Sequence, residues 1–198
     1  MSLLIETIKL ADGKFHNLFY HEQRMIRSLA NVCGVDEDLN LERLLDGLDV
    51  PQHGLFKCRI VYDELRKDVE FLPYEPRPIS SLKVVEHDRI VYDYKYRDRR
   101  VIDKLYEQRG GCDDILIVKK GGVTDASFAN IVFRKGRNWY TPWSALLKGT
   151  MRQNLLDNNK IMTENIQLED IGSFKTFKLI NAMLEFDSPE IDVSNIVL

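Results

Sequence analysis

Three prolines within six residues constrain the fold of this chain more than any other sequence feature. Pro73, Pro76 and Pro78 each lack a backbone N–H, and proline disfavours helical backbone in the residue before it. Neither a helix nor the interior of a sheet can run through such a segment, so the sequence predicts an extended linker. We therefore expect two domains, residues 1–77 and residues 78–198, which a chain of 198 residues permits.

Composition and charge exclude several classes of protein. The 28 Lys and Arg residues against 31 Asp and Glu give a net charge of -3, without the strongly basic balance that accompanies nucleic-acid binding. The longest stretch free of these four residues, Asn138 to Leu147, is far shorter than the ~20 apolar residues of a membrane span. No secretory leader opens the chain, and the three cysteines are widely spaced. We expect a cytoplasmic protein with no membrane segment, no nucleic-acid partner, no disulfide framework and no metal site.

Periodicity predicts mixed secondary structure in the first domain. Apolar and β-branched residues before Asp12-Gly13 indicate a hairpin, and apolar residues at helical spacing up to Gly34 indicate a helix. A short helix and a second strand pair follow. The expected elements are strands at Leu3–Leu10, Phe15–Tyr20, Gly54–Tyr62 and Asp68–Tyr74, and helices at His21–Cys33 and around Leu41–Leu48.

The second domain has a denser strand pattern. Lys-Gly-Gly and Lys-Gly turns separate runs of strand-forming residues, which is typical of an antiparallel meander. The expected strands are Ser81–Glu86, Asp114–Lys119, Gly122–Arg134, Asn138–Thr141, Ile161–Gln167 and Phe177–Glu185, with helices near Asp98–Gln108 and from Gly149. The predicted class is α+β: a small N-terminal α/β domain and a larger C-terminal domain with the meander.

Two basic segments could carry chemistry. Arg24, in His21-Glu22-Gln23-Arg24, could hold a phosphate through paired hydrogen bonds, or it could lie on a solvated helix face. Lys95 lies between Tyr94 and Tyr96 with arginines close behind, and such surroundings can lower the pKa of a lysine enough for Schiff-base chemistry. An exposed lysine in a turn is the alternative.

Two further segments have similar alternatives. Asp125 interrupts a strand of apolar and small residues, where a carboxylate is costly unless it is paired with a cation such as a protonated ring nitrogen. It could equally lie in water at a strand end. Lys148-Gly149-Thr150-Met151-Arg152 could offer helix-terminal amides to an anion, although Gly and Thr also cap many helices.

The order of these segments resembles one family. An Arg in H-x-x-R, then a Lys, V-T-D-x-x-x-x-N, Y-T-P and G-T-M-R are similar to the motifs of class IV aminotransferases, the fold-type IV pyridoxal-phosphate enzymes. The resemblance extends from Glu6 to about Phe186 and is strongest to 4-amino-4-deoxychorismate lyase. It implies a two-domain fold, pyridoxal 5'-phosphate as the cofactor, a small amino substrate and a homodimer.

The resemblance also implies roles for individual residues. Lys95 would form the Schiff base with pyridoxal phosphate and shuttle the proton. Arg24 would bind the phosphate together with the backbone amides of Thr150 and Met151, and Asp125 would pair with the pyridine nitrogen. Substrate-binding positions would be Arg99, Asn181 and Ala182.

The reaction implied is elimination of pyruvate from aminodeoxychorismate to give 4-aminobenzoate, a step in folate biosynthesis. A branched-chain or D-amino-acid aminotransferase, or a family member that has lost catalysis, are the alternatives. Two departures from the family motivate the last of these. Asp125 stands where the family usually has Glu, and the strand that normally precedes Glu6 is nearly absent.

Overall fold

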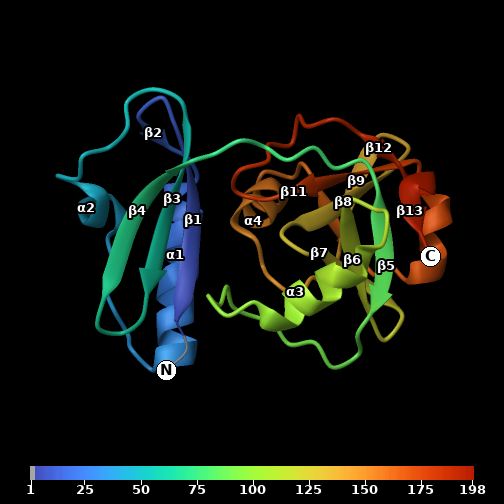
Figure 1. The fold of residues 1–198 in the computed structure, drawn as a ribbon, viewed down its shortest axis with the longest axis horizontal. Coiled ribbons are helices and arrows are strands. Elements are labelled where there is room, and N and C mark those ends of the chain that lie inside the picture. The colour runs from blue at the N-terminus through green and yellow to red at the C-terminus, as the bar shows by residue number, and fades with distance from the viewer. Residues whose placement is uncertain (1–2) are drawn as a thin grey trace. The chain divides into compact units, whose positions relative to one another are not determined.

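A computed structural model of the chain describes residues 3–198, which form two compact units (Figure 1). Unit 1 contains the chain up to Pro76 and also Tyr94–Asp98. Unit 2 contains Arg77–Asp93 and Arg99–Leu198. The chain therefore passes from unit 1 into unit 2, returns for five residues that include Lys95, and then completes unit 2. The sequence pattern does not predict this return.

Unit 1 is a four-stranded antiparallel sheet with helices, in the strand order β2-β1-β3-β4. Its strands are β1 (Leu4–Ala11), β2 (Lys14–Phe15), β3 (Leu55–Tyr62) and β4 (Lys67–Pro73). Its helices are α1 (Leu18–Ser28), a π-helical turn at Leu29–Cys33, and α2 (Leu41–Leu45).

The predicted return strand at Phe15–Tyr20 is wrong beyond its first residue. Only Lys14 and Phe15 pair with β1, and Asn17, at a positive φ of 57°, turns the chain directly into α1. The helix therefore begins three residues earlier than His21. The α-helix ends at Ser28, and Gly34, with a φ of 71°, ends the π-helical turn that follows it. Because β2 is so short, most of the outer edge of β1 stays available to another segment.

One face of this sheet forms the core of unit 1 with α1. Leu4, Ile8, Cys58 and Ile60 alternate on that face and pack against Met25 and neighbouring residues of the helix. Leu29, Leu41 and Leu45 extend the same cluster to the π-helical turn and to α2. Burial on this scale stabilises by roughly 1.5–3 kcal/mol for each large side chain.

Unit 2 is built on a mixed nine-stranded sheet, within residues 77–198 of the described chain. The order β10-β9-β8-β7-β6-β5-β13 forms its path, and β11 pairs with both β8 and β12. The strands are β5 (Leu82–Glu86), β6 (Asp114–Lys119), β7 (Gly122–Ala126), β8 (Asn130–Lys135), β9 (Asn138–Pro142), β10 (Met162–Glu164), β11 (Thr176–Ile180), β12 (Ile191–Asp192) and β13 (Ile196–Val197).

The helices of unit 2 are α3 (Arg100–Tyr106), which a 3-10 turn at Glu107–Arg109 continues, and α4 (Thr150–Asp157). Further 3-10 turns lie at Leu168–Ser173 and Val193–Asn195. Apolar clusters among the described residues hold the unit together. A larger one contains Phe133, Phe174 and Phe177, and a smaller one packs Leu155 of α4 against Val132 and Ile180 of the sheet.

The predicted α+β class and the antiparallel meander β6-β7-β8-β9 are confirmed. The single strand predicted at Gly122–Arg134 is wrong, because Ser127–Ala129 turns the chain between β7 and β8. The amide of Ala126 donates to the carbonyl of Ala129, and Asp125 faces Asn130 across the two strands. Two residues of one sequence motif therefore become direct neighbours.

No helix among residues 3–198 is long and apolar enough to cross a membrane.

Candidate active site

A buried carboxylate lies at the centre of unit 1. Glu6 lies on the same face of β1 as Leu4, Ile8 and Leu10, which is the face that α1 covers, and it is fully buried. A charge among these alternating apolar residues is costly unless an ion pair or hydrogen bonds from the helix compensate it. Two residues of α1, one turn apart, supply that compensation.

His21 and Arg24 both bind Glu6. Arg24 donates from Nε to Oε1 at 2.7 Å and from Nη2 to Oε2 at 2.5 Å, and His21 donates from Nδ1 to Oε2 at 2.6 Å. Burial alone would raise the pKa of Glu6, but Arg24 and His21 together hold it at about 2. Burial lowers the pKa of His21, against the attraction of Glu6. The cluster therefore contains an ionised Glu6, a charged Arg24 and a neutral His21 at pH 7, and Arg24 is not on a solvated face.

Lys95 belongs to the segment that returns to unit 1. The amide of Ile5 donates to the carbonyl of Lys95 at 2.9 Å, and the amide of Arg97 donates to the carbonyl of Leu3 at 2.8 Å. This segment uses the edge of β1 that the short β2 leaves open. Tyr94 and Tyr96, in an edge-to-face pair with centroids 6.1 Å apart, anchor it in the core.

The charge on Lys95 contributes to lowering the pKa of His21, after burial and Arg24. Unit 1 therefore places Arg24 and Lys95, which are 71 positions apart in the sequence, within electrostatic reach of one imidazole. Lys95 is half-buried rather than an exposed turn residue.

Asp125 is the buried carboxylate of unit 2. It lies on β7 and is 5% exposed, so the alternative of a strand end in water is wrong. Its Oδ1 accepts from Nδ2 of Asn130 at 2.7 Å, and its Oδ2 accepts from the amide of Leu147 at 2.9 Å. Burial raises the pKa of Asp125 to about 6, although these two donors and the charge of Arg152 oppose the rise. A carboxylate in this state gains strongly from a further cation.

Arg152 explains why three sequence motifs occur together. Its side chain is buried, with Nε donating to Oγ1 of Thr141 at 3.1 Å and Nη2 donating to the carbonyl of Pro142 at 3.1 Å. Burial lowers the pKa of Arg152, and the charge of Asp125 opposes this. The Y-T-P motif, the G-T-M-R motif and the carboxylate of V-T-D are thereby parts of one network.

The start of α4 has the properties of an anion site. Gly149 is the N-cap, Thr150 is buried, and no acidic residue stands in the first turn. The amides at the start of a helix carry a partial positive charge and lack partners within the helix. The side chain of Met151 packs against the smaller apolar cluster of unit 2, and this contact fixes the position of its backbone.

The remaining predicted residues support the turn between β7 and β8. Arg99 donates from Nη2 to the carbonyl of Ser127 at 2.7 Å, and Asn181 donates from Nδ2 to the carbonyl of Phe128 at 3.3 Å. Asn181 also accepts from the amides of Met183 and Leu184, which closes its own turn around Ala182. In the structure these residues therefore shape the backbone beside Asp125.

Asp114 holds the same turn from the sheet side. It is fully buried, accepts from the amide and hydroxyl of Ser127 at 3.2 and 3.0 Å, and forms an ion pair with Arg77 at 2.7 Å. Arg77 lies against the rings of Tyr106 and Phe128. Asp114 is the first residue of the predicted strand Asp114–Lys119, and the sequence pattern alone does not distinguish it from an ordinary carboxylate at a strand end.

Sequence reasoning missed four residues of these networks: Glu6, Asn130, Asp114 and Arg152. For Glu6 a signal was present, because it shares the strand parity of Leu4 and Ile8. For Asn130 the signal was its place in the V-T-D-x-x-x-x-N motif. Arg152 likewise stands in the G-T-M-R motif, although its contacts with Thr141 and Pro142 are not readable from the sequence. Asp114 becomes recognisable only through Ser127, a partner that is distant in sequence.

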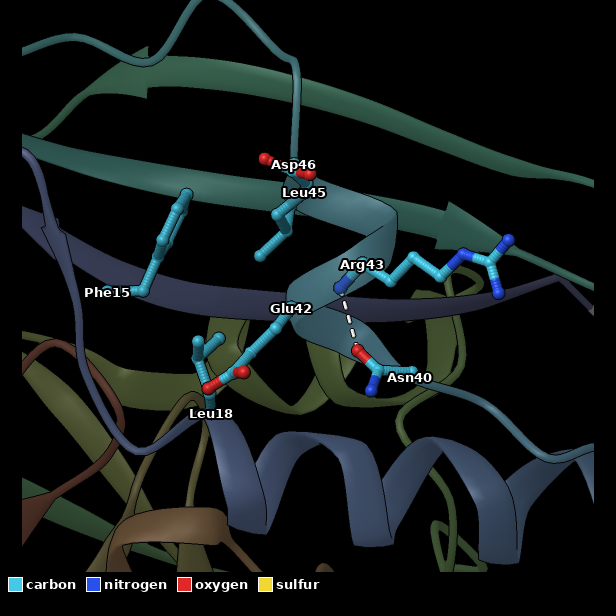
Figure 2. A pocket seen from close by; sticks show the side chains of 7 residues that line it. All are labelled: Phe15, Leu18, Asn40, Glu42, Arg43, Leu45 and Asp46. Atoms are coloured by element: carbon cyan, nitrogen blue, oxygen red, sulfur yellow. Dashed lines mark hydrogen bonds between the residues drawn. The ribbon is translucent and has the colours of Figure 1, made fainter.

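A separate cavity of about 550 Å³ opens on unit 1. Figure 2 shows that it lies where β2 and the start of α1 meet α2, with the Asn40 cap of α2 at one side. Within residues 3–198, none of the predicted site residues lines this cavity; the lining residues are Phe15, Leu18, Asn40, Glu42, Arg43, Leu45 and Asp46. The described residues also contain no group of three or more side chains that could hold a metal ion.

Comparison with known proteins identifies relatives over most of the chain. A model of the amino-transferase class IV family matches residues 70–186. A protein of uncharacterized function from Haemophilus influenzae is 40% identical over 182 residues, which are 91% of this chain and 97% of the other.

Solved structures are also similar to this chain. A provisionally named 4-amino-4-deoxychorismate lyase from Haemophilus somnus is 34% identical with a TM-score of 0.86, and the match covers 92% of this chain and 97% of that one. A hypothetical aminotransferase from Mycobacterium tuberculosis, in its PLP-bound form, has a TM-score of 0.77 at 18% identity, over 98% of this chain and 81% of that one. The second likeness shows the fold alone. Together they confirm the predicted two-part α+β architecture.

Proposed function

The chain belongs to the amino-transferase class IV family, and we propose that it is the lyase that eliminates pyruvate from 4-amino-4-deoxychorismate to give 4-aminobenzoate. Membership of this family makes it an enzyme that depends on pyridoxal 5'-phosphate. The choice of substrate and the role of each residue are the proposal. Our observation in its favour is Asp125, with the family's motif residues around it.

The residues of unit 2 fit one end of this cofactor. Asp125 is buried, its pKa is raised to about 6, and its oxygens accept from Nδ2 of Asn130 and from the amide of Leu147, while a hydrogen bond from the amide of Leu146 also lowers its pKa. The two oxygens of a carboxylate have about four acceptor positions, so an additional N–H donor can be accommodated. A protonated pyridine nitrogen is such a donor and supplies the missing cation. The substitution of Asp for the usual Glu shortens the side chain but leaves the carboxylate well placed by its neighbours.

The phosphate end also has matching groups. Arg24 is a guanidinium whose plane is fixed by Glu6, and the amides of Thr150 and Met151 begin a helix without an acidic first turn. Both kinds of group bind phosphate well, through charge-assisted hydrogen bonds and through the helix dipole. We assign these residues to phosphate binding.

Lys95 would carry the proton transfers. Pyridoxal phosphate, when bound, supplies the electron sink for the reaction. The Nζ amine of Lys95 would hold the cofactor before substrate arrives and would then take the proton from the amino-bearing carbon of the substrate. Arg99, Asn181 and Ala182 would bind substrate, and their contacts with the turn at Ser127 and Phe128 would set the shape of its pocket.

The likeness to the provisionally named lyase from Haemophilus somnus favours elimination over transamination. A branched-chain or D-amino-acid aminotransferase is the second candidate within the family. Purified protein, reconstituted with pyridoxal phosphate, should release equimolar pyruvate and 4-aminobenzoate from aminodeoxychorismate. Amino transfer to 2-oxoglutarate without pyruvate release would refute the lyase assignment and leave a pyridoxal-phosphate enzyme.

A lysine variant tests the assignment of the amine. Lys95→Ala should lose both the visible absorption band of the lysine-bound cofactor and all turnover. Lys104→Ala, which removes an exposed lysine from α3, should keep both. If the wild-type protein binds the cofactor but shows neither this absorption band nor turnover, the chain is a family member that has lost catalysis.

Three further properties belong to the same proposal. We propose a homodimer, a role in folate biosynthesis through 4-aminobenzoate, and a cytoplasmic location. Light scattering of the purified protein tests the first: a mass of twice 23.1 kDa supports it, and a monomeric mass with full activity contradicts it.

A further inference from the structure

The side-chain amide of Asn130 belongs to a small closed network of hydrogen bonds, and Nδ2 donates both of its hydrogens within it. Nδ2 donates to Oδ1 of Asp125 at 2.7 Å and to the carbonyl of Leu147 at 2.8 Å. The amide of Leu147 in turn donates to Oδ2 of Asp125 at 2.9 Å. Asn130, Leu147 and Asp125 therefore form a ring of three hydrogen bonds, which fixes the plane of the carboxylate.

The other end of the Asn130 carboxamide lies against Gly149. A Cβ atom added at Gly149 would stand 2.0 Å from Oδ1 of Asn130 and 3.2 Å from its Cγ. Real Cβ contacts are never that short, so the carboxamide and an alanine at position 149 exclude each other. The backbone of Gly149, with φ -67° and ψ 146°, suits any L-residue. Glycine is therefore required here for space and not for conformation.

From this geometry we propose that Asn130 is a positioning residue that couples the carboxylate of Asp125 to the start of α4. The inference rests on the proposed function, which assigns Asp125 to the ring nitrogen of pyridoxal phosphate and the start of α4 to its phosphate. One buried side chain, 5% exposed, thereby sets the groups for two separate parts of the cofactor. Asn130 acts through Asp125 and Gly149.

This coupling has a particular value in a chain with Asp in place of Glu. An aspartate has fewer side-chain torsions than a glutamate, so its carboxylate cannot swing to follow a displaced ring. Its position is decided by the strand and by Asn130 and Leu147. A shift of the carboxamide would move the carboxylate away and would also disturb the packing on Gly149.

A double-mutant cycle tests the coupling, with Asn130→Ala, Gly149→Ala and the two combined. The first removes the donor to Asp125, and the second forces the carboxamide out of its place. Each should weaken the binding of pyridoxal phosphate by about 10- to 100-fold, because a hydrogen bond to a charged group contributes on the order of one to two powers of ten. In the combined variant the alanine has room, since the next atom, Cβ of Arg152, lies at 3.8 Å.

Gly149→Ala should therefore cost less than about twofold when Asn130 is already alanine. Gly172→Ala, a glycine with no atom within 4 Å of an added Cβ, is the matched control and should leave binding unchanged. If Asn130→Ala does not fold, Asn130→Ser replaces it, because serine also lacks the amide donor and leaves space at Gly149.

A second measurement uses the protein without cofactor. The pKa of Asp125, followed by carbon-13 NMR of its carboxyl group, should rise in Asn130→Ala and in Gly149→Ala, because the bond from Asn130 lowers it. A residue that only fills space would change thermal stability without moving this pKa.

Independent, additive effects of the two substitutions on affinity would overturn the coupling, as would an Asp125 pKa that is unchanged in both single variants. Failure of the proposed function has a different signature. Wild-type protein would then bind no pyridoxal phosphate, while the NMR titration would still decide whether Asn130 and Gly149 position Asp125.

Discussion

Replacing Glu6 by Gln should destabilise unit 1 much more than its conservative size suggests. The substitution keeps the shape of the side chain but removes the charge that faces Arg24. Both side chains are at most 6% exposed, so water cannot compensate the guanidinium that is left. Removing one partner of a buried ion pair typically costs ~3–5 kcal/mol.

The pKa of Glu6 gives a second measure of the same interaction. It is about 2 in the folded chain against an ordinary 4.5, and at ~1.4 kcal/mol per pH unit this difference corresponds to ~3 kcal/mol at neutral pH. Because the folded pKa is the lower one, this stability is fully present above pH 4.5 and is lost as the pH falls through about 2. The lowered pKa of His21 acts in the same direction, because the unfolded state takes up a proton first as the pH falls through 6.5.

The assay must report on unit 1. Both tryptophans, Trp139 and Trp143, lie in unit 2, so their fluorescence follows the other unit. Urea unfolding should therefore be followed by hydrogen exchange in β1 and α1 as well as by fluorescence. We expect Glu6→Gln to lose ~3 kcal/mol in the exchange measurement at pH 7.

An exposed ion pair in the same sheet supplies the control. Glu70 accepts from Arg59 at 2.8 Å, with both side chains about one third or more exposed. Glu70→Gln should cost no more than ~1 kcal/mol, since exposed pairs contribute little. The double variant Glu6→Leu with Arg24→Met should recover much of the loss, because no charge is left buried. Equal losses in Glu6→Gln and Glu70→Gln would refute the reasoning.

Three other predictions concern unit 2. The pKa of Asp125 is raised to about 6 from 3.8, so the folded state holds this proton more tightly than the unfolded state, and the free energy of unfolding should fall as the pH rises from 4 to 6. In urea titrations Asp125→Asn should abolish this pH dependence. If the dependence persists in the variant, it comes from another group. Arg152→Met removes two buried hydrogen bonds to β9, including that to Thr141, and should lower the free energy of unfolding by ~2–4 kcal/mol in thermal unfolding. It should also raise the pKa of Asp125, which carboxyl NMR would report, because the charge of Arg152 lowers that pKa in the wild type. Asp114→Ala leaves the amide and hydroxyl of Ser127 without their acceptor and should cost ~2–3 kcal/mol, with faster hydrogen exchange in the turn between β7 and β8; unchanged exchange there would contradict this role.

Secondary structure could be predicted from the sequence wherever one local pattern decided it. The strands β3, β5, β6 and β9 and the helix α4 lie within a few residues of their expected bounds, because periodicity and turn residues are local signals. The errors occurred where a tertiary contact overrode the pattern. Residues 16–20 have strand-like character, but Asn17 turns the chain and α1 begins at Leu18. Ser127 lies in the turn between β7 and β8, where the buried Asp114 binds it.

For the candidate site, the order of motifs in the sequence by itself determined the family and its candidate residues, which remain predictions in their individual roles. Only the tertiary structure decided which neighbours control those residues. Glu6 meets Arg24 across 18 positions, and Asp125 meets Leu147 across 22. Burial and hydrogen bonding of this kind depend on which elements pack together, and no local pattern encodes the partner. The sequence thus identified Arg24, Lys95 and Asp125, while the fold determined that they are buried or half-buried and brought in partners such as Glu6 that the sequence had not singled out.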